Sequence, residues 1–288
     1  MIVLQLVVNG ILLGGVLALS ALGFNIIFCV MRVVNLAHGD FVVLAATACV
    51  FLFASASVNP LLLLPLMIII GFVAGAAVYY GLLRNLPGDV ASAEASSLTL
   101  TFGLSYFLSG GGLAIFGGRF ASVPFLTGAY QVAGISIPQA RLLAFVVAIV
   151  LSLLFALFLR MTAMGRAIRA TSQHVEGALG CGVNVDRVRT FAFAIGTAVA
   201  MAAGTLMSFL VNLNVQQGVL FTVNAFAVVV IGGLGNYTGA ILGAVILGLA
   251  ESFTSYYLGA TLAEAAPYFL FILVLLFAPA GLLGKRTA

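Results

Sequence analysis

The stretch RMTAMGRAIRATSQHVEGALGCGVNVDRVR, residues 160–189, is a polar island between two long apolar segments. It holds five of the eleven basic residues of the chain, together with Glu176 and Asp186. Residues 142–159 before it carry no charge, and no charged residue follows it until Glu251. Long uncharged segments on both sides of a charged loop are typical of membrane-spanning helices that are joined outside the bilayer.

The composition of the whole chain agrees with this interpretation. The chain is 64% hydrophobic and 6% charged, whereas a soluble domain carries roughly 25% charged residues. A transmembrane β-barrel would show short segments of alternating hydrophobicity, but residues 61–83 and 269–283 are continuously apolar. We therefore predict an all-α integral membrane protein, a polytopic helical bundle that forms one membrane domain over residues 1–288. The net charge of +4 does not indicate nucleic-acid binding, because no basic run is interleaved with aromatic residues.

Nine apolar segments are long enough to cross a bilayer as helices. The seventh and eighth are separated only by a glycine-rich turn around Gly233, so the count lies between eight and ten, with nine preferred. Pairs with GxxxG spacing, such as Gly10 with Gly14, recur within the segments and predict close packing of helices. The predicted spans are 3–30, 41–58, 61–83, 97–116, 142–159, 190–210, 219–233, 238–258 and 267–283.

Basic residues predict the orientation, because they concentrate in cytoplasmic loops. With nine spans and the N-terminus outside, nine of the eleven basic residues fall on the cytoplasmic side, and only Arg119 and Arg141 remain outside. With eight spans, Lys285 and Arg286 would also lie outside. We therefore predict an external N-terminus, a cytoplasmic C-terminus and a cytoplasmic loop at residues 160–189. The outer loop at residues 117–140 is too polar to span and is expected to form a cap or a short surface helix.

The cytoplasmic loop has the pattern of an ordered helix. Its polar residues recur at steps of three and four, with apolar residues on the other side, which predicts one amphipathic helix over residues 166–179. Glycines then end the helix, and Asn184 or Asp186 would cap the next one. A loop that only set topology or touched lipid headgroups would not need a capped helix, so the pattern favours docking to a cytoplasmic partner. The residues predicted to couple to this partner are Arg166, Arg169, Gln173, Glu176, Ala178, Gly180 and Gly182.

Three stretches of the sequence resemble a known transporter family. The run EGALGCG at residues 176–182 is similar to the EAAxxxG core of the coupling loop in ATP-binding cassette (ABC) importer permeases, with Gly177 in place of the first alanine. The wider segment at 165–206, RVVNLAHGDF at 32–41 and VVVIGGLGNYTGAILGAVILG at 228–248 resemble the branched-chain amino acid (LivH/LivM-type) permease family. The resemblance therefore extends over the first third, the central loop and the last third of the chain.

This resemblance implies a permease subunit of an ABC importer in a bacterial cytoplasmic (inner) membrane. Its partners would be a second permease subunit, which is a related chain or a copy of itself, two cytoplasmic ABC ATPases, and a periplasmic or extracellular solute-binding protein. The solute would be a branched-chain amino acid or a related small polar solute such as urea or a short amide. The sequence has no GxxxxGK[ST] motif, so ATP and Mg²⁺ would bind to the partner ATPases, and no cofactor or metal site is expected in this chain.

The segment at residues 32–41 gathers polar residues next to the second span, at the predicted cytoplasmic edge. They either pair and cap that span or contribute to a cytoplasmic gate. An enzyme is not expected, because no Ser or Cys nucleophile and no metal-ligand cluster accompanies the His–Asp pair. The residues of this motif are Arg32, Asn35, His38 and Asp40.

Polar residues within the spans mark either a solute route or hydrogen bonds between helices, because a polar group in hydrocarbon is costly. Most of them are amides and hydroxyls, which suit a polar, uncharged or zwitterionic solute. Glu251 is the only acid inside a predicted span, and it keeps a second function open, that of a stand-alone secondary transporter or channel. The candidate pathway residues are Asn9, Asn25, Thr101, Ser105, Asn224 and Glu251.

Overall fold

The computed structural model of the chain describes residues 1–85, 90–132 and 134–284. Within these ranges, nine helical segments are long and apolar enough to cross a membrane, as predicted. Seven of them are α1 (Ile2–Met31), α2 (His38–Ala56), α3 (Pro60–Val78) continued by a π-helical turn (Tyr79–Leu83), α4 (Val90–Phe116), α5 (Gln139–Met161), α8 (Val185–Met207) and α10 (Tyr237–Tyr257). The other two are α9 (Gly218–Gly232), which follows a 3₁₀ turn (Val215–Gln217), and the pair α11 (Ala260–Ala263) and α12 (Ala266–Phe277).

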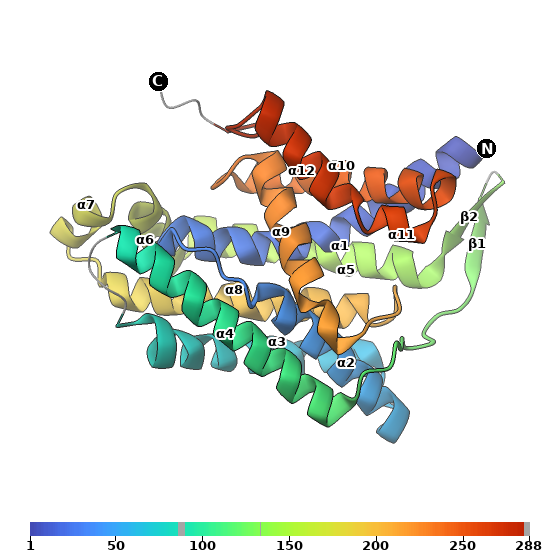
Figure 1. Cartoon of the computed structure of the whole chain (residues 1–288), viewed down its shortest axis with the longest axis horizontal. Helices are drawn as coiled ribbons and strands as arrows, with labels where there is room; N and C mark the ends of the chain where they lie inside the picture. Colours follow the sequence, from blue (N-terminus) through green and yellow to red (C-terminus); the bar gives the residue numbers. More distant parts are fainter. Residues whose placement is uncertain (86–89, 133, 285–288) are drawn as a thin grey trace.

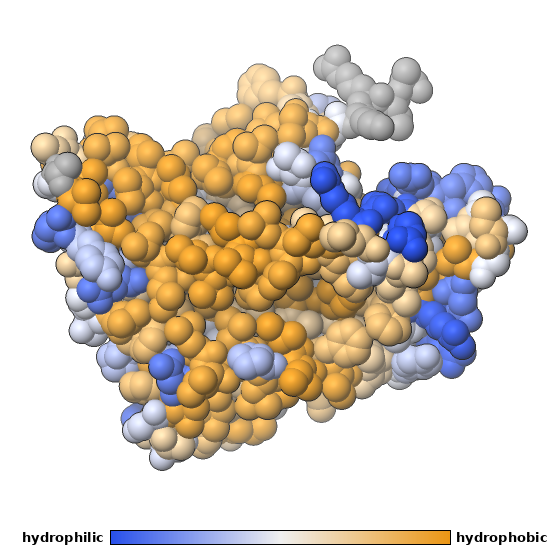
Figure 2. All heavy atoms as spheres, turned by 180° about the vertical axis from the view of Figure 1, so that it is seen from behind, coloured by the Kyte–Doolittle hydropathy of each residue, from blue (hydrophilic) through white to orange (hydrophobic). Residues whose placement is uncertain are grey.

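Most spans run along the long axis of the molecule. The short helices α6 (Ala163–Gln173) and α7 (Val175–Gly180) lie at one end, and the N-terminus lies at the other end with strands β1 (Ala129–Val132) and β2 (Ile135–Pro138) (Figure 1). We call these the α7 end and the hairpin end. Seen from behind, the flank between the two ends is apolar, and hydrophilic residues gather towards the ends (Figure 2). This distribution fits a bilayer around the middle of the bundle.

The core of the bundle is built around α8. Of its apolar window, 83% is buried, against 11–22% for α3, α4, α5 and the α11–α12 pair. The predicted GxxxG pairs permit this packing: a Cβ on Gly71 or Gly75 of α3 would lie 2.8 Å from backbone of α8. On α1, a Cβ on Gly10 or Gly14 would lie 2.8 Å from backbone of α10. The glycines therefore serve close helix packing, as expected.

The outer loop forms a hairpin where the sequence predicted a cap or a surface helix. Strands β1 and β2 pair antiparallel and lead directly into α5. The side chain of Gln5 on α1 binds this hairpin twice: its Nε2 donates to the carbonyl of Ser136 at 2.6 Å, and its Oε1 accepts from the N–H of Ser136 at 2.8 Å. The surface-helix alternative is therefore wrong, and the loop covers the N-terminal end of α1.

The last span ends earlier than predicted. Helix α12 stops at Phe277, because Pro279 cannot donate a helical hydrogen bond and disfavours a helical conformation in the residue before it. The chain then turns back along α9, where Leu282 N donates to the carbonyl of Ile231 at 2.8 Å. This contact places residues 282–284 at the end of the bundle opposite to the N-terminus, as an odd number of spans requires.

Candidate coupling site and solute route

The predicted amphipathic helix over residues 166–179 is broken in two. Helix α6 ends at Gln173, and His174 adopts an extended conformation, with φ −153° and ψ 105°, before α7 begins. The imidazole Nδ1 of His174 accepts a hydrogen bond from the N–H of Gly177 at 2.8 Å and so caps α7. The periodicity of the sequence does not reveal the break, because polar residues continue at steps of three and four on both sides of residue 174. The single-helix prediction is therefore wrong in detail, although both pieces are helical.

The two short helices expose a different set of side chains from the predicted one. Arg166, Gln173 and Glu176 are exposed as expected. Arg169 instead turns inward, and its guanidinium donates to the carbonyl of Leu159 at the end of α5. Leu179 falls on the side of the predicted helix opposite to its polar residues, but it is 55% exposed at the tip of α7.

The exit from α7 is shaped by glycine, as the sequence predicts. Gly182 has a φ of +77°, which residues with side chains rarely adopt, and its N–H donates to the carbonyl of Leu179 at 2.9 Å. Gly180 is exposed, whereas Ala178 is buried beneath the turn. The side chain of Asn184 then caps α8 by accepting from the N–H of Arg187 at 3.0 Å.

Two spans are joined to the α6–α7 unit without a flexible linker. Thr162 is both the last capping residue of α5 and the N-cap of α6, where its Oγ1 accepts from the N–H of Gly165 at 2.9 Å. At the other side only residues 181–184 separate α7 from α8. A force on α7 would therefore reach α5 and α8 directly.

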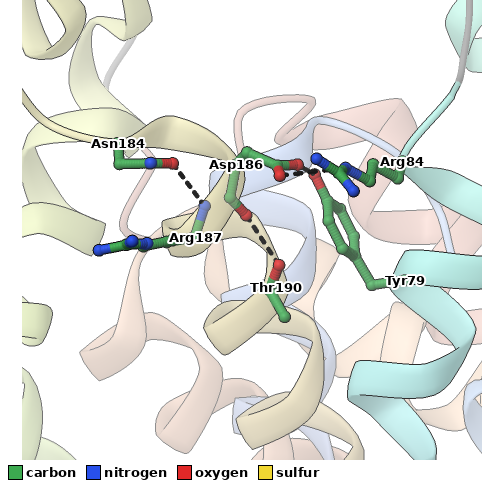
Figure 3. A network of polar contacts seen from close by, with 6 residues as sticks. All are labelled: Tyr79, Arg84, Asn184, Asp186, Arg187 and Thr190. Atoms are coloured by element: carbon green, nitrogen blue, oxygen red, sulfur yellow. Dashed lines mark hydrogen bonds and ion pairs between the residues drawn. The ribbon is translucent and has the colours of Figure 1, made fainter.

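A polar network at the start of α8 links it to α3 (Figure 3). Asp186 accepts a hydrogen bond from the hydroxyl of Tyr79 at 2.7 Å, and its other carboxylate oxygen lies 3.2 Å from Nε of Arg84. Because both charged side chains are about half exposed, the ion pair is worth at most about 1 kcal/mol, and its main effect is positional. Sequence analysis missed Tyr79 and Arg84, since nothing local marks a contact across 107 residues.

The motif at residues 32–41 begins at the α7 end of the bundle and continues into its interior. Arg32, with a φ of 57°, ends α1, and its guanidinium donates to the carbonyl of Ser172 in α6 at 3.1 Å. The chain then runs back along α1 without helical structure, and His38 Nε2 lies 3.1 Å from the carbonyl of Ser20. Ser20 precedes Met31 by 11 residues, which is about 16 Å along the helix axis. The predicted edge position therefore holds for Arg32 but is wrong for His38 and Asp40, which are buried inside the bundle.

The segment at residues 33–39, which runs back along α1, forms hydrogen bonds with threonines on two other helices. The hydroxyl of Thr222 on α9 donates to the carbonyl of Leu36 at 2.9 Å and accepts from the N–H of Gly39 at 2.8 Å. Thr101 on α4, a predicted pathway residue, accepts from the N–H of Leu36 at 3.3 Å. Both threonines therefore pair with backbone groups that would otherwise be without partners in the membrane. Sequence analysis did not single out Thr222.

Replacing Thr222 with valine is expected to lower the free energy of unfolding by about 2–4 kcal/mol. The substitution keeps the shape but leaves the N–H of Gly39 and the carbonyl of Leu36 buried without this partner, at about 1–3 kcal/mol for each group. Thermal unfolding of the purified chain measures the effect. Thr222→Ser keeps the hydroxyl and serves as the control; equal loss in both variants would contradict this role.

The predicted pathway residues do not form one group. The side-chain oxygen of Asn25 accepts from the N–H of Gly235 at 3.2 Å, so this residue ties α1 to the loop between α9 and α10. Asn9 lines a separate cavity beneath the outer loop, and Ser105 lies close to the carboxylate of Asp40. Only Asn224 and Glu251 line a common cavity, which lies between α1, α9, α10 and α11.

This cavity combines apolar walls with unpaired polar groups. Asn224 is 8% exposed and its Oδ1 has no hydrogen-bond partner, and Glu251 has no ion-pair or hydrogen-bond partner among the described residues. Glu264 at the end of α11 also lines the cavity, as do the aliphatic side chains of Leu13, Leu17, Val211 and Leu220. The expectation that Glu251 is the only acid within a span is wrong, because the observed spans also include Asp40, Asp186 and Glu264.

Comparison with known proteins identifies the family of this chain. Residues 6–279 match the family described as branched-chain amino acid transport system / permease component. The permease protein LivH of a high-affinity branched-chain amino acid transport system from Escherichia coli (strain K12) is 31% identical, and the match covers 98% of this chain and 96% of that protein. BraD of Pseudomonas aeruginosa, named as a permease protein of the same kind of system, is 28% identical over 98% of this chain and 96% of its own length.

A solved structure has the same fold. PsaBC from Streptococcus pneumoniae in complex with Fab superimposes with a TM-score of 0.51 at 14% identity, covering 94% of this chain and 91% of that chain. The full-length similarity to the E. coli protein confirms the predicted multi-pass protein of a bacterial cytoplasmic membrane. It also confirms that the chain is a transport component and not an enzyme. The chain belongs to the branched-chain amino acid transport permease family of ABC importers.

Proposed function

We propose that this chain is the membrane domain, over residues 1–288, of an importer that moves a branched-chain amino acid into the cytoplasm. Two cytoplasmic ATPases that bind ATP and Mg²⁺ would drive it, a second permease subunit would complete the pathway, and a solute-binding protein would deliver the amino acid. The α7 end is then cytoplasmic and the hairpin end external. The names of the full-length relatives support this assignment of solute class.

The observation that carries the ATP-driven mechanism is the exposed helix α7 between two spans. With the coupling loop at residues 160–189 docked on an ATPase, closure of the ATPase dimer would displace α7 and, through the short joints, α5 and α8. The Asp186 network would pass the displacement to α3. Arg166, Gln173, Glu176, Gly180 and Gly182 would form or shape the docking surface, while Arg169 and Ala178 would support it from beneath.

The cavity with Glu251 favours an amino acid over urea or a short neutral amide. A carboxylate within a span and without a cation is costly, and the ammonium group of an amino acid would supply that cation. The aliphatic walls suit a branched side chain, and the volume of about 170 Å³, below the roughly 300–1,000 Å³ of drug-sized ligand sites, restricts the occupant to a small solute. Asn224 would donate and accept hydrogen bonds at the polar end.

The Glu251→Gln variant tests this substrate class. Uptake of radiolabelled leucine into proteoliposomes that contain the whole complex, the binding protein and internal ATP is expected to fall at least tenfold, because one buried charge pair is lost, at about 2 kcal/mol or more. Glu251→Asp, which keeps a carboxylate in the cavity, is the matched control and should retain more uptake than Glu251→Gln. If Glu251→Gln transports leucine normally, or if urea competes equally with leucine, the proposed solute class is refuted.

A stand-alone secondary transporter or channel is the second candidate, because an unpaired carboxylate within a span is a typical proton site. This second function predicts that the purified chain alone takes up solute when a proton gradient is applied and ATP is absent. The ATP-dependent function requires no uptake under these conditions, so the two candidates give opposite results in one assay.

A further inference from the structure

A second cavity, at the α7 end, is lined by three arginines. It has a volume of about 670 Å³ and lies between α1, α5, α6 and the start of α10. Arg32, Arg160 and Arg169 come from three different elements and all line it, and none of the described residues that line it is acidic. Hydrophilic residues gather at this end, next to the apolar flank of the bundle (Figure 2).

Among the described residues, no acidic side chain neutralises the positive charge in this cavity. Arg32 and Arg169 donate only to backbone carbonyls, and Arg160 has no partner within the described part of the chain. Tyr237 and Thr238 in the first turn of α10 also line the cavity, so the positive end of this helix dipole points to the same place. The combined groups form a site for an anion.

Most of the remaining side chains that line the cavity are apolar, apart from Ser152 and Asn236. Below the arginines it is lined by Phe155 and Ala156 of α5, Ile241 of α10 and Leu22 of α1. Ala156 and Ile241 are exposed and lie within membrane-spanning helices, so this part of the wall is within reach of lipid. A soluble anion would gain nothing from this wall, whereas acyl chains would cover it.

From this combination we propose that the cavity binds an anionic phospholipid, with its phosphate among Arg32, Arg160 and Arg169 and its acyl chains along the groove between α5 and α10. Basic pockets between membrane helices near a membrane surface recognise such headgroups. The lipid would join α6 to α1, α5 and α10 at the point where the coupling loop enters the bundle. This site is separate from the cavity with Glu251 and does not depend on which solute is carried.

Native mass spectrometry of the full-length chain in detergent, titrated with phosphatidylglycerol or phosphatidylcholine of the same acyl chains, tests the proposal. We expect one phosphatidylglycerol molecule to bind in preference to phosphatidylcholine. Arg160→Gln is expected to weaken phosphatidylglycerol binding about fivefold, because each basic side chain contributes roughly 1 kcal/mol to the binding of an anionic lipid. Since Arg160 bonds to no described residue, this variant should fold, and Arg160→Lys should restore the preference.

Three controls separate this site from other sources of binding. Arg187→Gln removes an exposed charge at the same end, where the side chain points away from Asp186, and should leave phosphatidylglycerol binding unchanged (Figure 3). Ala156→Phe should obstruct the groove and weaken lipid binding without removing charge. Inorganic phosphate at millimolar concentration should not displace the lipid. Equal binding of both lipids, an equal effect of Arg187→Gln, or displacement by phosphate would each overturn the proposal.

Discussion

Replacing Leu179 with aspartate is expected to abolish ATP-driven uptake while the permease remains folded. Leu179 is 55% exposed at the tip of α7 and contributes little to the core of this chain. In a docked complex its burial would contribute about 1.5–3 kcal/mol, which corresponds to about 10- to 100-fold in affinity, and a carboxylate would add a desolvation cost. Copurification of the ATPases and solute-stimulated ATP hydrolysis measure the loss.

The matched control is Leu179→Met, which keeps an apolar side chain of similar volume and should retain both activities. Thermal unfolding of the Leu179→Asp permease alone should match that of the parent chain, because the side chain lies outside the core. Normal copurification of the ATPases with Leu179→Asp would show that α7 does not dock them. A lowered unfolding temperature would mean that Leu179 serves the fold of the permease instead.

Replacing Gly204 with alanine is expected to destabilise the bundle strongly. Gly204 on α8 lies against α2, and a Cβ at this position would be 2.0 Å from the carbonyl oxygen of Val42. Backbone cannot yield as a flexible side chain does, so α2 would have to move away from the most enclosed helix of the bundle. Overpacking of this kind costs about 1–3 kcal/mol and occasionally more. Thermal unfolding and the yield of folded protein in the membrane measure the effect.

Gly103→Ala is the control, because this substitution is not expected to lower the free energy of unfolding. Gly103 lies in α4, and no atom lies within 4 Å of the position its Cβ would occupy. Alanine there removes a flexible residue from a helix, so the unfolding free energy should stay the same or rise by up to about 1 kcal/mol. Equal behaviour of the two variants would show that contact between α2 and α8 does not limit stability.

Sequence reasoning predicted that the loop at residues 160–189 is helical but not which side chains it exposes. The steps of three and four among the polar residues predicted a helix, and α6 and α7 are helical. The orientation of single side chains was less predictable: Arg169 turns to a carbonyl of α5, and Leu179 turns outward. The direction of α7 depends on the extended residue His174, whose cap on that helix is a matter of local geometry and not of periodicity.

For the candidate pathway residues too, the sequence predicted the residue type that matters but not the partner of each side chain. An amide or hydroxyl in a span signals only that it needs a polar partner, and the partner can be a neighbouring backbone or a solute. For Asn25 and Thr101 the backbone partner exists, so these residues hold the fold together. For Asn224 and Glu251 no such partner is present among the described residues, and the two line one cavity. Sequence alone could not separate these cases.

The sequence by itself determined the membrane class, the nine spans and the family, because apolar length, loop charge and motif spacing are properties of local stretches read against a bilayer of fixed thickness. Only the tertiary structure decided that His38 lies deep inside the bundle, that Asp186 joins α8 to α3, and that three arginines surround one cavity. Each of these features brings together residues from separate helices. Their proximity depends on how the helices pack, and no local pattern records that packing.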